Sequence, residues 1–108
     1  MNDFDSEDDC APPPEFPGCL VKQMKIVNRK GLHARATAKF VHCVEAFTGA
    51  EIFVNRCGET VGGTSIMGIL TLGAGMGSTI TVAAKGEQAH AALEAVAALI
   101  ANRFGEDE

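Results

Sequence analysis

Hydrophobic residues recur along the chain with two different spacings, and the spacing predicts which segments form strands and which form helices. Apolar residues predominate from Leu20 to Val27, and apolar and polar residues alternate over 50–55 and 79–84. Both patterns are typical of half-buried strands. Arg56-Cys57-Gly58 predicts a tight turn into a short partner strand at residues 59–61. Four strands are therefore expected.

Two longer segments repeat apolar residues at steps of three or four, which is the spacing of an amphipathic helix. The first stripe, which ends near Gly49, comprises Thr37, Phe40, Val41, Val44 and Phe47. The second stripe predicts a helix from Glu87 to about Arg103. It comprises Ala89, Leu93, Val96, Leu99, Ile100 and Phe104. A short helix over 65–70, capped by Thr64 or Ser65, completes the set. The element order predicts an α+β fold, in which three helices cover one face of a mainly antiparallel four-stranded sheet.

Charge divides the chain into a body and two acidic ends. Residues 1–18 hold six acids, no base and a proline run, and residues 106–108 are all acidic. We expect a disordered tail over 1–18, which either screens a basic site or is an inert leader, one domain over 19–105, and an acidic end over 106–108. The body is basic on balance although the net charge is -5.

Composition argues against several classes of protein. The chain has no Trp or Tyr to stack on bases, no clustered arginine stripe, and no apolar run or signal peptide that indicates a membrane. We therefore expect a cytoplasmic protein that neither binds nucleic acid nor inserts into a membrane. The cysteines form no CxxC pair, so free thiols are expected. A metal site is the weaker alternative, because its candidate ligands match no zinc spacing: His42, Cys43, Cys57 and His90.

His33 lies between Gly31 and a predicted helix, with Arg29, Lys30 and Arg35 close by in the sequence. Unpaired N–H groups and the helix dipole make a helix start an anion site. The same positive surroundings disfavour an imidazolium, so that one ring nitrogen keeps a lone pair for attack on phosphorus. The pattern indicates phosphoryl chemistry at His33, and an ordinary loop histidine is the alternative.

Two blocks carry a resemblance to a known family. Gly31-Leu32-His33-Ala34-Arg35 resembles the active-site motif of HPr, the histidine-containing phosphocarrier of the phosphoenolpyruvate-dependent phosphotransferase system, and Ser65 to Gly73 resembles the regulatory serine segment of that family. The resemblance covers residues 20–104 and implies an open-faced β-sandwich. It also implies that His33 accepts a phosphoryl group at Nδ1 from enzyme I and passes it to an enzyme IIA-type protein, with Arg35 as phosphate partner. Such a protein is a monomeric phosphoryl carrier, not a stand-alone enzyme, and needs no cofactor.

The second block implies docking and regulation. Ile66, Met67 and Leu70 would form an apolar docking patch, with core packing as the alternative for some of them. Ser65 would be phosphorylated by an HPr kinase/phosphorylase, and the added charge would repel an acidic partner. A regulatory binding module controlled through Ser65, without carrier activity, is the alternative function.

Two positions depart from the pattern of the family. Ala36 stands where many members have proline, which predicts a looser first helical turn, and Lys30 replaces a small polar residue. These features resemble the nitrogen-regulatory branch more than a sugar-transport carrier. The sequence leaves the downstream acceptor open.

Overall fold

Four strands form one antiparallel sheet in the computed structural model, which describes residues 14–108. They are β1 (Leu20–Lys25), β2 (Glu51–Arg56), β3 (Glu59–Gly62) and β4 (Thr79–Lys85), in the spatial order β1-β4-β2-β3. Every strand pair is antiparallel, and Val21, Ala83 and Phe53 share one row across three strands. The predicted sheet is confirmed.

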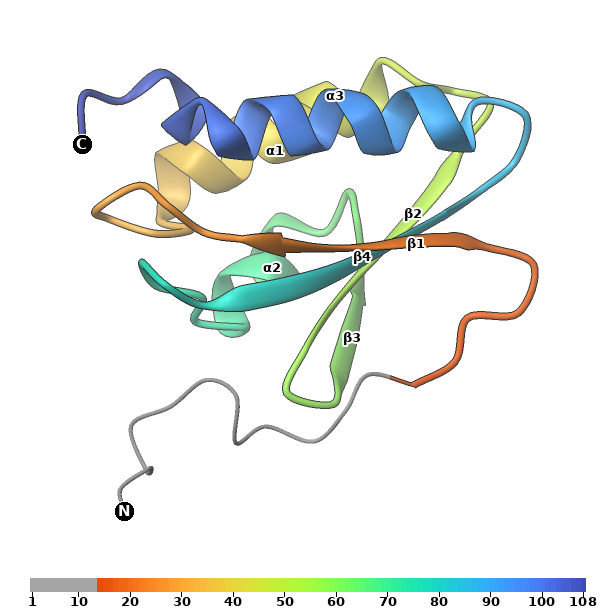
Figure 1. Ribbon diagram of the computed structural model, residues 1–108, viewed down its shortest axis with the longest axis horizontal. Coiled ribbons are helices and arrows are strands. Elements are labelled where there is room, and N and C mark those ends of the chain that lie inside the picture. Colours follow the sequence, from red (N-terminus) through yellow and green to blue (C-terminus); the bar gives the residue numbers. More distant parts are fainter. Residues whose placement is uncertain (1–13) are drawn as a thin grey trace.

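Three helices supply the second layer: α1 (Ala34–Glu45), α2 (Ile66–Thr71) and α3 (Ala89–Ala101). Figure 1 shows α1 and α3 lying alongside each other over the sheet. The inward residues of the strands and the apolar stripes of the helices form one core; its members with the least exposure include Ile26, Phe40, Val54, Ile69, Ile80, Val82, Val96 and Ile100. The α+β sandwich with helices on one face follows from this packing, because each layer buries the apolar face of the other.

The hairpin between β2 and β3 has the two-residue turn that the sequence predicts. Cys57 and Gly58 have φ angles of 53° and 86°, and two positive angles in succession match the twist of the flanking strands. Cys57 is disulfide-bonded, whereas Cys19 and Cys43 are free thiols. The expectation of free thiols is therefore wrong at Cys57. Burial raises the pKa of the Cys43 thiol, which suits a packing role.

The segment before β1 covers part of the outer face of the sheet. Phe16 stacks on Phe53 with ring centroids 6.5 Å apart, and the Lys85 ammonium lies 5.9 Å from the Phe53 ring. Most of the tail that was predicted to be disordered, residues 1–13, lies outside the described residues. Within residues 14–108 no helix has the length and apolar character that crossing a bilayer requires.

The chain turns sharply after α3. The apolar stripe predicted a helix to about Arg103, but α3 ends at Ala101 and a 3-10 turn, η3 (Arg103–Gly105), follows. Arg103 and Phe104 have φ angles of 57° and 55°, in the left-handed region. Phe104 is nevertheless buried, with 1% of its surface exposed. Burial of this ring compensates for the backbone strain and directs residues 106–108 back toward the start of α1.

Candidate functional site

The loop before α1 is packed tightly against the loop after α2. The Leu32 N–H donates to the Ala74 carbonyl at 2.8 Å. Gly31 has a φ of 67°, and a Cβ at this position would lie 2.6 Å from the same carbonyl oxygen. Only glycine satisfies both the backbone angle and the close approach. The absence of a side chain at Gly31 therefore allows the two loops to pack closely.

His33 is the N-cap of α1. Its backbone is extended, with φ -75° and ψ -178°, and its carbonyl accepts the first helical hydrogen bond from the Thr37 N–H at 2.8 Å. Its side chain makes no capping bond, so the ring is available to other groups. The N–H groups of the first turn have no acceptor inside the helix, as at any helix start. The structure therefore places the imidazole of His33 at the N-terminus of a helix.

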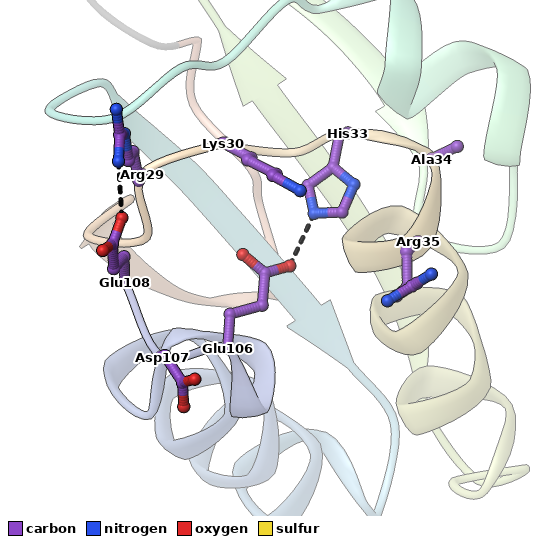
Figure 2. A pocket seen from close by; sticks show the side chains of 8 residues that line it. All are labelled: Arg29, Lys30, His33, Ala34, Arg35, Glu106, Asp107 and Glu108. Carbon is purple, nitrogen blue, oxygen red and sulfur yellow. Dashed lines mark hydrogen bonds and ion pairs between the residues drawn. The ribbon is translucent and has the colours of Figure 1, made fainter.

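A carboxylate that sequence reasoning did not place at the site contacts the imidazole. His33 Nε2 lies 2.5 Å from Glu106 Oε2 (Figure 2). The other carboxylate oxygen accepts a hydrogen bond of 3.0 Å from the Asn28 amide, which also donates to the Gly31 carbonyl at 2.8 Å. Asn28 is fully buried. It thus connects the site loop to the C-terminal segment.

The surroundings of Glu106 favour its ionised form. The hydrogen bond with His33, and after it the hydrogen bond from Asn28, hold the pKa of the carboxyl below its ordinary value, and charge on His33 and Lys30 acts in the same direction. Partial burial opposes the shift but is the smaller effect. The ring of His33 therefore faces an anion on its Nε2 side, which corrects the expectation of purely cationic surroundings.

Residues 104–108 are fastened to the site by contacts at both ends. Lys39 donates to the Phe104 carbonyl at 2.7 Å. At the other end, the Arg29 N–H donates to the Glu108 carbonyl at 2.9 Å, and the Arg29 guanidinium lies 2.7 Å from the Glu108 carboxylate. We call residues 104–108 the C-terminal strap. The strap places Glu106 beside the ring of His33 (Figure 2).

Two cations at the site, Lys30 and Arg35, are exposed, and neither side chain forms a hydrogen bond or a close ion pair among residues 14–108. Both line the same open pocket as His33 and Glu106. Figure 2 shows the Arg35 side chain on the first turn of α1, close to the imidazole and on the side away from Arg29. A guanidinium without an internal partner is suited to bind phosphate oxygens, because its paired N–H donors match them.

The second predicted block lies on α2, which packs against α1. Ser65, one of the two predicted caps, is the N-cap of α2, and its hydroxyl accepts from the Gly68 N–H at 3.1 Å. Ile66 and Met67 are exposed by 43% and 70%, while Leu70 is half-buried. The structure therefore leaves two of the three predicted docking residues largely open to solvent.

The alternative metal site is not assembled. In the part of the chain that the structure describes, no three His, Cys, Asp or Glu side chains converge as metal ligands. Cys57, one of the candidate ligands, is disulfide-bonded instead.

Comparison with known proteins identifies the family of the chain. A profile of the family described as "PTS HPr component phosphorylation site" matches residues 20–102. The chain is 44% identical to the phosphocarrier protein HPr of Cupriavidus necator over 82% of this chain and 99% of that protein. It is 41% identical to the phosphocarrier protein NPr of Shewanella violacea over 81% of this chain and 94% of that protein. The chain therefore belongs to the HPr family of phosphotransferase-system phosphocarriers.

The solved structures agree. The crystal structure of an HPr from Thermoanaerobacter tengcongensis superposes with a TM-score of 0.78 at 35% identity, and covers 82% of this chain and 99% of its own. The open-faced sandwich that the resemblance implied is thus confirmed.

Proposed function

We propose that this protein is a phosphocarrier that accepts a phosphoryl group on His33 Nδ1 from phospho-enzyme I and passes it to an enzyme IIA-type protein. One observation carries the proposal: His33, 28% of whose side chain is exposed, caps the start of α1 beside the unengaged guanidinium of Arg35. A nucleophile, an anion-binding helix end and a free cation thus meet at one accessible point. Family membership supports the same assignment.

The transfer step is a displacement at phosphorus. The Nδ1 lone pair forms the new N–P bond while the bond between phosphorus and the donor's leaving atom breaks, and its electron pair stays on the donor. The phosphoryl oxygens would then face the N–H groups at the start of α1 and the Arg35 guanidinium. Because this charge support is partly solvated, the phosphoryl group is stabilised without being trapped. The same step in reverse delivers it to the acceptor.

The docking patch of Ile66, Met67 and Leu70 supports the assignment of protein partners. Large exposed apolar side chains on a helix next to the site are typical of an interface. Enzyme I and the enzyme IIA-type acceptor would in turn cover this patch, which places His33 against the reacting group of each. We assign the protein to the cytoplasm as a monomer, where these partners would meet it.

Ser65 is the candidate regulatory position. Its hydroxyl is exposed enough to be modified, yet already occupies a helix N-cap, where a phosphate is electrostatically favoured. A charge of about -2 at this point would lie beside the docking patch and repel an acidic partner surface. We therefore propose that an HPr kinase/phosphorylase acting on Ser65 lowers transfer through His33.

The deciding experiment is incubation of the purified protein with enzyme I and radiolabelled phosphoenolpyruvate. We expect an acid-labile, base-stable label that is absent in His33→Ala. His42→Ala is the matched control, because His42 is an exposed histidine on the same helix and should be labelled normally. Equal labelling of the two variants would refute the carrier assignment.

Acceptors of the sugar-transport and the nitrogen-regulatory type, offered to the labelled protein in parallel, would show which branch it serves. We expect faster transfer to the nitrogen-regulatory type, in line with Lys30 and Ala36.

The alternative, a regulatory module without carrier activity, makes the opposite prediction. In that case Ser65→Asp would change partner affinity, while His33→Ala would leave both affinity and regulation intact. Titration of each variant with enzyme I by calorimetry separates the two functions.

A further inference from the structure

We propose that Glu106 is a positioning residue for His33: its carboxylate holds the proton of the neutral imidazole on Nε2 and so presents the Nδ1 lone pair to phosphorus. This inference deepens the proposed function and rests on it.

The tautomer follows from the chemistry of the contact. An ionised carboxylate only accepts hydrogen bonds, so the hydrogen between the two atoms, 2.5 Å apart, must be carried by Nε2. A neutral imidazole has one N–H, and its other nitrogen is then the free base. The lowered pKa of Glu106 supports the assumption that the carboxylate is ionised. Figure 2 shows the second ring nitrogen turned away from Glu106, toward Ala34 and the start of α1.

The carboxylate is itself held in place, which distinguishes it from a mobile surface acid. Its second oxygen is fixed by the amide of Asn28, a buried residue at the end of the site loop. The strap is anchored before Glu106 by the buried ring of Phe104, and after it by the pairing of Glu108 with Arg29. A group positioned by packing and hydrogen bonds selects a ring orientation without reorganising during the reaction.

Glu106 also faces the charge that the transfer creates. When Nδ1 attacks phosphorus, no proton needs to leave the ring, because Nδ1 carries none. The ring becomes a phosphorylated imidazolium whose Nε2–H still donates to the carboxylate, as in other histidine–carboxylate pairs. The Arg35 guanidinium, on the first turn of α1, would face the phosphoryl oxygens instead. The negative carboxylate would thus stabilise the positive ring, and the positive guanidinium would stabilise the negative phosphoryl group.

The test reads the tautomer directly on the unphosphorylated protein. We expect ¹⁵N–¹H NMR of the His33 ring, at alkaline pH where imidazoles are neutral, to show Nε2 protonated and Nδ1 as free base. In Glu106→Gln the amide oxygen can accept from Nε2–H in one tautomer, and the amide N–H can donate to unprotonated Nε2 in the other, so a mixture of tautomers should appear. Asp107→Asn is the matched control: it removes the same charge one residue along, and the Asp107 carboxylate has no partner among residues 14–108. It should retain the wild-type ring spectrum.

The kinetic readout accompanies the spectrum. The rate of phosphoryl uptake from phospho-enzyme I should fall about tenfold or more in Glu106→Gln, the range typical of orienting partners of histidine, and by a much smaller factor in Asp107→Asn. Protonation of Nδ1 in the wild type, or the same tautomer in wild type and Glu106→Gln, would overturn the positioning role. A wild-type protein that takes no label would instead refute the proposed function. The two failures are therefore distinguishable, and backbone amide spectra report whether each variant is folded.

Discussion

The ammonium of Lys39 donates a hydrogen bond to the backbone carbonyl of Phe104 at 2.7 Å, which joins the helix that carries the site to the turn after the last helix. Phe104 has a left-handed backbone and a buried ring. Because a left-handed turn otherwise leaves its carbonyl groups to solvent, the lysine both satisfies the carbonyl and fixes the exit direction of the chain. The placement of the C-terminal strap therefore depends on a residue of α1.

Replacement of Lys39 should loosen the strap. In Lys39→Met the apolar stem remains but the donor is lost, and we expect the free energy of unfolding to fall by about 1 kcal/mol, the usual net value of such a bond. Lys22→Met is the control, because Lys22 is exposed on β1 and its side chain forms no hydrogen bond or ion pair within residues 14–108. Urea unfolding measures both variants. Equal stability of the two would show that the contact contributes nothing.

Substitution of Gly31 tests the junction between the two loops. Gly31 and Gly73 have nearly equal φ angles, 67° and 66°, but a Cβ at Gly73 meets no atom within 4 Å. Gly73→Ala should therefore cost only the left-handed backbone term, about 1 kcal/mol. Gly31→Ala adds the clash with the Ala74 carbonyl and should destabilise the fold by about 3 kcal/mol or more.

The comparison is made by urea unfolding of each alanine variant against wild type. If the two alanine variants unfold at the same urea concentration, the close packing of the loops is unimportant for stability.

Arg35 is predicted to bind the transferred group by shape as well as by charge. Arg35→Ala should slow phosphoryl uptake about 10- to 100-fold, which corresponds to the loss of about 1.5–3 kcal/mol from a hydrogen bond to a charged group. Arg35→Lys should recover only part of this loss, because an ammonium has no paired donors. Initial labelling rates at fixed enzyme I concentration give the order. Full recovery by lysine would mean that charge alone matters.

Acid should weaken the strap through Glu106. Its pKa is lower in the folded protein than in the unfolded chain, so the unfolded chain binds more protons as the pH falls below the ordinary glutamate value of about 4.3. The stabilisation is therefore complete above that value and is lost as the pH falls through the lower pKa of the folded state. We expect the slope of unfolding free energy against pH below about 4.5 to be shallower in Glu106→Gln than in wild type.

Denaturant unfolding at several pH values measures this slope. Asp107→Asn serves again as control, and a slope as shallow as that of Glu106→Gln would trace the effect to general acidity of the chain end.

Most of the fold could be derived from local patterns because local forces determine those parts. Ser65 was expected at a helix N-cap and the turn at Cys57-Gly58 was expected to form a hairpin, and both depend on chemistry within a few residues. The alternation in β2 likewise identified Ile52 and Val54 as inward residues. His33 and Arg35 were singled out from a five-residue motif, and the structure places both at the start of α1.

The C-terminal strap escaped the same reasoning for a physical reason. Phe104 continues the apolar stripe of α3, so the pattern extends the helix through a position where the chain actually turns. Two consecutive residues other than glycine with positive φ, Arg103 and Phe104, have no local sequence signal; tertiary packing decides their conformation. Asn28 has no local sequence signal either, although it is a buried donor that holds Glu106. The contacts of Glu106 with Asn28 and with His33 each join residues more than seventy positions apart in the sequence.

Asp107 occupies an unusual place on the strap. It lines the pocket of His33 and is exposed. Among residues 14–108 its side chain forms no hydrogen bond or ion pair, and its backbone carbonyl accepts a hydrogen bond of 3.0 Å from the Arg103 guanidinium. A cysteine introduced there would carry a fluorescent or ¹⁹F label within the pocket without removing a side-chain bond. Such a label would report arrival of a phosphoryl group or a partner in real time, and the strap thus gives the protein a natural attachment point for a sensor.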